Sequence, residues 1–204
     1  MSFLPPSFIE DFLRGFVTNL WVGGASLLLG LAVGGLLAWL RFVGGIFGRI
    51  ATAATSLFNA TPTFVAMFVL LNLLPRSIVI ADYSATVPMA TFVILSLGIY
   101  AASNISNGLL DTLRYLREGS VRAAMLFIPN TTRVFVVLVL ASSTGAAIGV
   151  PEAVTVTLRH AELLPDIQSR IMLVGLALVM FMLLVQALEA VVRTASGWLV
   201  RRRS

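Results

Sequence analysis

The feature that most constrains this chain is a set of five apolar runs, each about as long as a bilayer-crossing helix. Hydrophobic residues make up 58% of the chain and charged residues 11%, and the mean hydropathy is +0.98. Soluble domains carry roughly 25% charged residues, whereas a transmembrane helix needs about 20 mostly apolar residues. The sequence predicts an all-α membrane protein with one transmembrane domain over residues 1–204, with spans near 20–40, 51–74, 87–108, 131–150 and 171–192.

Two shorter segments have amphipathic helical patterns. Between the third and fourth runs, a charged segment extends from Asp111 to Arg122. A short amphipathic helix between two spans either lies on the lipid surface or binds a partner protein. Near the N-terminus, the phenylalanines of residues 7–16 recur every four residues, which predicts a helix in the membrane interface. In the first span, Gly30 and Gly34 have the spacing that lets membrane helices pack closely. The alternative is that these glycines contact a solute directly.

Polar residues inside the runs are candidates for a translocation path. Pro62 removes a helix hydrogen bond, which produces either a simple kink or a broken helix of the kind that flanks transporter binding sites. Asn104 and Asn107 share one helix face, where they would either line a polar cavity or bond a neighbouring helix. The candidate path residues are Thr61, Pro62, Asn72, Asn104, Asn107, Ser142, Ser143 and Thr144.

The distribution of arginines predicts the orientation. One set of loops and ends contains Arg41, Arg49, Arg114, Arg117, Arg122, Arg193 and the terminal arginines, and the other contains Arg14, Arg76, Arg159, Arg170 and most of the acids. Because the arginine-rich side of a membrane protein is cytoplasmic, we expect the N-terminus outside, the C-terminus inside and residues 111–129 in the cytoplasm.

Several function classes are excluded or disfavoured by composition. The chain has no cysteine, one histidine (His160) and no lysine, so it lacks a Gly-x-x-x-x-Gly-Lys-Ser/Thr phosphate loop. No His, Cys or Asp occupies the centre of a run, so we expect neither catalytic residues nor a metal site, and the chain is not expected to be an enzyme. The net charge of +5 reflects membrane orientation, and no nucleic acid partner is expected.

Four motifs in order connect the chain to a known family. They are Gly15-Phe16-Val17-Thr18, Asn59-Ala60-Thr61-Pro62, Gly119-Ser120-Val121-Arg122-Ala123-Ala124 and Ile148-Gly149-Val150-Pro151-Glu152. Together with the five-span topology and the orientation, they resemble the membrane-spanning permease subunit of ABC importers of the polar amino acid family. The resemblance covers residues 13 to 195.

The resemblance implies a multi-pass subunit of the bacterial inner membrane that imports amino acids or similar small polar solutes by ATP-driven alternating access. It implies as partners ABC ATPase subunits, a second permease subunit (identical or related), an extracytoplasmic solute-binding protein and membrane lipid. ATP would be bound by the ATPase subunits, so no cofactor is expected in this chain. The residues implied in coupling to the ATPase are Arg117, Glu118, Gly119, Arg122, Ala123 and Ala124.

The chain departs from the family pattern at two motifs. Arg122 stands where the coupling loop usually has glutamate, and Leu140-Ala141-Ser142-Ser143 replaces the usual Lys-Asp-Thr-Ser. The stretch from Tyr100 to Gly149 is also shorter than in the family, and another register would place Gly108 at the coupling glycine. A second hypothesis therefore remains: a membrane assembly or accessory subunit, derived from such a permease, that no longer transports.

Overall fold

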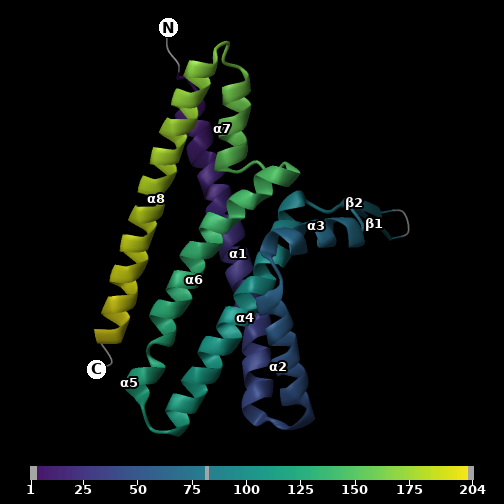
Figure 1. Cartoon of the computed structure of the whole chain (residues 1–204), viewed down its shortest axis with the longest axis vertical. Helices are drawn as coiled ribbons and strands as arrows, with labels where there is room; N and C mark the ends of the chain where they lie inside the picture. The colour runs from purple at the N-terminus through teal and green to yellow at the C-terminus, as the bar shows by residue number, and fades with distance from the viewer. Residues whose placement is uncertain (1–3, 81–82, 202–204) are drawn as a thin grey trace.

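The computed structural model describes the backbone of residues 4–80 and 83–201 and the side chains of residues 4–77 and 86–194. Its elements are α1 (Phe8–Val43), α2 (Gly45–Ala60), α3 (Thr63–Leu73), β1 (Ser77–Ile80), β2 (Tyr83–Thr86), α4 (Met89–Arg117), α5 (Val121–Ala124), α6 (Phe127–Ala141), the 3₁₀ helix η1 (Ser142–Ile148), α7 (Ala153–Glu162) and α8 (Ile167–Arg201). The long helices run along one axis (Figure 1). The N-terminus and the α7–α8 turn lie at one end, and the α1–α2 corner and α5 lie toward the other.

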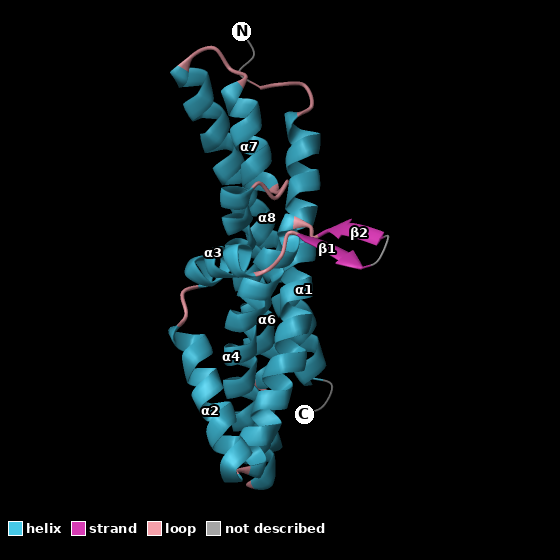
Figure 2. Cartoon of the chain, turned by 90° about the vertical axis from the view of Figure 1, so that its right-hand side faces the viewer, coloured by secondary structure: helices cyan, strands magenta, loops and turns pink. Residues whose placement is uncertain are grey.

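The fold confirms the prediction of an all-α membrane protein. Among the described residues, four helices are long and apolar enough to cross a bilayer, and the α2–α3 pair makes a fifth if it counts as one span. A short antiparallel hairpin is the exception (Figure 2), with Ser77 paired to Thr86 where the sequence predicts a loop. Asp82 of that loop, and Arg202 and Arg203 of the tail, lie outside the described residues.

Helix α1 joins two segments that the sequence pattern separates, the short helix of residues 7–16 and the first span. No proline or positive-φ glycine lies between them, so the helix continues without a break. Phe8, Phe12 and Phe16 are buried in a core that also contains residues of α6, α7 and α8. The expectation of a separate helix that rests its phenylalanine face on lipid is therefore wrong, because the segment is part of α1 and the three rings are covered by protein.

The two glycines of the first span face α4. A Cβ at Gly30 would overlap the Cβ of Ala101, and a Cβ at Gly34 would overlap the carbonyl oxygen of Ala102. The missing side chains allow the two backbones to approach closely, as the spacing predicts. Helices α1 and α4 therefore form a close-packed pair at the centre of the bundle (Figure 1).

The second apolar run is broken and does not form one straight helix. Helix α2 ends at Ala60 and α3 begins at Thr63, with an angle of 103° between them. Pro62 cannot donate a helix hydrogen bond and it biases the preceding residue toward extended backbone, which Thr61 adopts (φ −86°, ψ 115°). The break at Pro62 is thus confirmed, and α3 runs across the bundle (Figure 2).

Helix α4 extends beyond the expected third span. The charged residues from Asp111 to Arg117 form its last two turns, so the prediction of a separate amphipathic helix is wrong for this part of the segment. The helix ends in a Schellman motif, in which the amide of Ser120 donates to the carbonyl of Tyr115 over 2.8 Å. Gly119 supplies the left-handed residue that this motif needs, at φ +79°.

The fourth span and the following loop also differ from expectation. Helix α6 begins at Phe127, with Pro129 in the first turn, where a missing amide does no harm. The chain then tightens into η1 and stops at Gly149, which has φ +82°. Residues 151–170, expected to be a loop, contain helix α7, which is capped by Glu152.

Candidate functional site

The structure divides the predicted polar residues among several places. The Glu152 junction comprises Asn19, Ser142, Ser143, Glu152 and Thr155, and lies where α1, η1 and α7 meet. The Arg41 junction comprises Arg41, Thr55, Ser106 and Asn107, at the corner of α1, α2 and α4. The elbow is the segment 111–129, which connects α4 to α6 through α5.

Glu152 is 1% exposed and accepts four hydrogen bonds. Its Oε1 accepts from the amide and the hydroxyl of Thr155, over 2.7 and 3.0 Å. Its Oε2 accepts from the amide of Val154 over 3.0 Å and from Nδ2 of Asn19 over 3.2 Å. The carboxylate also lies at the N-terminus of α7, where the helix dipole favours negative charge. These donors compensate for the burial of the carboxyl group.

Asn19 connects this carboxylate to the rest of the junction. Its Nδ2 also donates to Oγ of Ser142 over 2.8 Å, and its Oδ1 accepts from the amide of Ala153 over 3.2 Å. Because Asn19 belongs to α1 and its partners to η1 and α7, one amide side chain ties three elements together. The hydroxyl of Ser143 lies farther from Nδ2, at 3.4 Å. Ser142 and Ser143, predicted to line a path, thus take part in this junction, where Ser142 is buried and Ser143 half-buried.

The Arg41 junction uses another predicted path residue in the same way. One guanidinium nitrogen of Arg41 donates to Oγ of Ser106 over 2.9 Å and to Oδ1 of Asn107 over 2.8 Å. The hydroxyl of Thr55 lies 3.3 Å from that of Ser106, which adds α2 to the contact. Asn107 therefore bonds a neighbouring helix, one of the two outcomes that its position allowed.

The remaining polar candidates bond backbone carbonyls three or four residues earlier in the chain. Thr61 donates to Leu57, Asn72 to Phe68, Asn104 to Tyr100 and Thr144 to Ala141, over 2.7 to 2.9 Å. Pro62 is exposed at the break between α2 and α3. The candidate path residues thus fall into separate groups within this chain, and a path lined by them stays a prediction.

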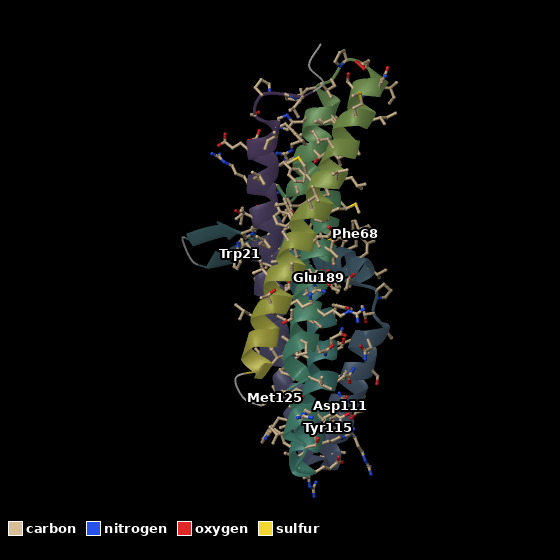
Figure 3. The ribbon with its side chains drawn as sticks, turned by 90° about the vertical axis from the view of Figure 1, so that its left-hand side faces the viewer. Trp21, Phe68, Asp111, Tyr115, Met125 and Glu189 are labelled. Carbon is tan, nitrogen blue, oxygen red and sulfur yellow. The ribbon has the colours of Figure 1, made fainter. Side chains whose placement is uncertain are left out.

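The elbow presents its predicted coupling residues at the surface. Arg117, Glu118, Gly119 and Arg122 are exposed, while Ala123 is half-buried and Ala124 is buried. A groove of about 430 Å³ lies beside them, between the end of α4 and the start of α6. It is lined mainly by apolar side chains, among them Leu116, Val121 and Met125. Figure 3 shows Asp111, Tyr115 and Met125 gathered at this end of the molecule.

Two functional features escaped sequence reasoning. Glu152 stands directly before α7 and caps it, but glutamate is not one of the residues that mark a helix start in sequence. Its partner Asn19 lies 133 residues away, and no local signal connects the two. At the same end, His160 Nε2 lies 3.0 Å from Oδ2 of Asp11, so this histidine joins α7 to α1.

Comparison with known proteins gives a structural match without a sequence match. No family model and no curated protein matches the chain. The solved structure of an amino acid ABC transporter with histidines aligns with a TM-score of 0.68 and 13% identity, covering 96% of this chain and 95% of that one. The inward-facing MetNI methionine ABC transporter aligns with a TM-score of 0.66 and 14% identity, covering 98% and 100%.

The chain has the fold of an ABC transporter permease. This agreement confirms the expected permease-like architecture over nearly the whole chain. Identities of 13% and 14% establish the fold alone, so the solute, the partners and the transport cycle of this chain belong to the proposal below.

Proposed function

We propose that this chain is the transmembrane subunit of an ABC importer in the bacterial inner membrane. The observation that carries the proposal is the shared fold, which extends over 96% and 98% of the chain in the two comparisons. The imported solute would be an amino acid or a similar small polar molecule, and import would proceed by ATP-driven alternating access. An extracytoplasmic solute-binding protein would deliver the solute.

The elbow is the proposed binding site for the ATPase subunits. Its charged residues project into solvent instead of pairing within the chain core, and its groove leaves Leu116 and Val121 49% and 55% exposed. A mixed surface of this kind, with an apolar centre and a charged rim, is typical of protein–protein contacts. Residues 111–129 would therefore transmit nucleotide-driven closure of the ATPases to α4 and α6, while ATP stays in the partner subunits.

A second permease subunit is the proposed partner within the membrane. The break between α2 and α3 leaves Asn59, Ala60 and Pro62 exposed in the single chain. Non-helical backbone at membrane depth is tolerated only where protein or a water-filled cavity covers it. A second chain, identical or related, that packs near this break would cover it and would enclose a path between the two subunits.

Purification from native membranes tests the proposal. We expect two five-span chains with two ATPase subunits, and ATP-driven uptake of the solute by the reconstituted complex. Leu116→Asp, which places a charge in the groove, should release the ATPases, whereas Leu178→Asp on the outer face of α8 should retain them in detergent. A well-behaved particle with one copy and no ATPase would refute the proposal, and a 2:2 complex without uptake would favour the accessory subunit.

A further inference from the structure

A cleft between α6 and α8 has no role in the transport scheme above. Its volume is about 500 Å³, and it is lined by Arg133 of α6 and by Glu189 and Arg193 of α8. Val136 and Val137 of α6 form its apolar part. Figure 3 shows Glu189 where α8 passes beside α6. The cleft therefore combines two cationic groups, one anionic group and an apolar wall.

The position of the cleft along α8 matches a membrane boundary. The stretch from Ile171 to Leu188 contains no charged residue, and its length as a helix is roughly 27 Å. The hydrocarbon core of a bilayer is about 30 Å thick. Glu189 is the first charged residue after this stretch, so the charged side of the cleft lies where the lipid headgroups begin.

The surroundings of the cleft are suited to lipid. Along the outer face of α8, Leu178, Met182 and Leu183 are 53–62% exposed, as expected of side chains that contact acyl chains. Val136 is shared between the cleft and the core that joins α6 to α8. A phospholipid at this position would thus place its glycerol and upper acyl chain against the valines and its headgroup beside the charged residues.

The charges select among headgroups. Guanidinium groups bind phosphate strongly through paired N–H donors, and both Arg133 and Arg193 line the cleft. Glu189 can accept hydrogen bonds from an ammonium group, but it would repel a headgroup that carries only negative charge. We propose that this cleft binds a phospholipid whose headgroup contains both a phosphate and a primary ammonium, namely phosphatidylethanolamine. The proposal requires only that the chain resides in a membrane, and it does not depend on transport.

The first test uses the unmodified protein. The full chain, with any subunits that accompany it, is released from nanodiscs of equal phosphatidylethanolamine, phosphatidylcholine and phosphatidylglycerol, and retained lipids are counted by native mass spectrometry. Phosphatidylcholine lacks ammonium N–H donors and phosphatidylglycerol lacks the ammonium group. We expect phosphatidylethanolamine to be retained about fivefold over each, the factor that one net hydrogen bond provides. Equal retention of the three lipids would overturn the proposal.

Matched variants assign the preference to the cleft. Glu189→Gln should abolish the preference over phosphatidylglycerol, and Arg133→Gln combined with Arg193→Gln should lower retention of all three lipids. Glu162→Gln and Arg76→Gln change exposed charges that do not line the cleft and should leave retention unchanged. Equal losses in the cleft variants and in these controls would contradict the assignment.

Two further experiments test whether a soluble molecule or a second protein chain, and not a lipid, occupies the cleft. Full displacement by free glycerophosphoethanolamine would assign the cleft to a soluble zwitterion and overturn the lipid. Disulfide-linked dimers formed through Val137→Cys, without any lipid preference, would show that a second copy covers the cleft and would overturn it as well. Resistance to both, with the headgroup preference intact, supports the bound phospholipid.

Discussion

The Glu152 junction and the elbow both join successive helices, yet the chain uses polar residues in them in opposite ways. In the junction, Glu152 and Asn19 are 1% and 0% exposed and bond groups from three elements. In the elbow, Asp111 and Arg114 are 58% and 62% exposed, and their closest charged atoms are 3.7 Å apart. Buried polar groups must be paired within the chain, whereas exposed charges remain available to a partner.

This difference teaches how to interpret polar residues in an apolar chain. Ser142 and Asn107 were predicted to line a path because polar groups at membrane depth avoid lipid. Both bond a neighbouring helix. A polar side chain inside a membrane segment thus indicates protein or water beside it, and only the fold decides between the two.

The largest expected effect follows the loss of the buried carboxylate. Glu152→Ala would leave the amides of Val154 and Thr155 without their acceptor and would remove one of the acceptors of Asn19 Nδ2, which should cost about 3 kcal/mol of stability. Thermal unfolding in detergent should show a clear drop in Tm. Glu162→Ala, at an exposed position near the end of the same helix, is the control and should change little. An unchanged Tm for Glu152→Ala would show that the buried polar groups of the Glu152 junction stabilise the fold no more than the exposed charges of the elbow.

A smaller effect is expected at the Arg41 junction. Asn107→Ala removes an acceptor from a charged donor and should cost about 2 kcal/mol. Asn104→Ala removes only a bond to the carbonyl of Tyr100 in the same helix, so its cost should be lower. Unfolding measurements on both variants, together with solute uptake, separate the roles. If Asn107→Ala loses uptake while its stability is normal, Asn107 acts in the translocation path and does not only stabilise the fold.

The smallest effect on stability is expected in the elbow. Gly119→Ala places a Cβ at φ +79° but in open space, so the cost is about 1 kcal/mol of backbone strain. ATP hydrolysis should nevertheless become less dependent on solute, because the angle between α4 and α5 is set at this residue. Gly24→Ala is the control: it also meets open space, but inside a helix, where alanine is favourable. Normal coupling in Gly119→Ala would count against the elbow as the ATPase site.

Local chemistry made part of the fold predictable. Pro62 alone predicted where the second run breaks, and the spacing of Gly30 and Gly34 predicted a close helix contact. The 103° angle at the break depends on how α3 packs against α4 through Met67, which no local pattern contains. The charged segment after Gly108 was predicted to be a separate helix. It contains no residue that interrupts α4 before Gly119, so α4 continues through it.

The candidate site was less predictable for the same physical reason. Exposure of the elbow follows from its charges, so Arg117 and Arg122 could be placed at the surface from sequence. The hydrogen bond between Asn19 and Glu152 joins residues 133 positions apart, and that contact exists only after α7 folds back onto α1. Sequence periodicity records the face of a helix, but it does not record which helix will lie opposite.

The glycine contact between α1 and α4 also determines which parts of the chain can move separately. With Gly30 and Gly34 fitted against Ala101 and Ala102, the two helices cannot slide past each other without a steric clash, so they behave mechanically as one strut. The elbow is attached to one end of α4, and α3 contacts the opposite end of α4 through Met67 and Val93. A push on the elbow would tilt the two helices together and would displace α3.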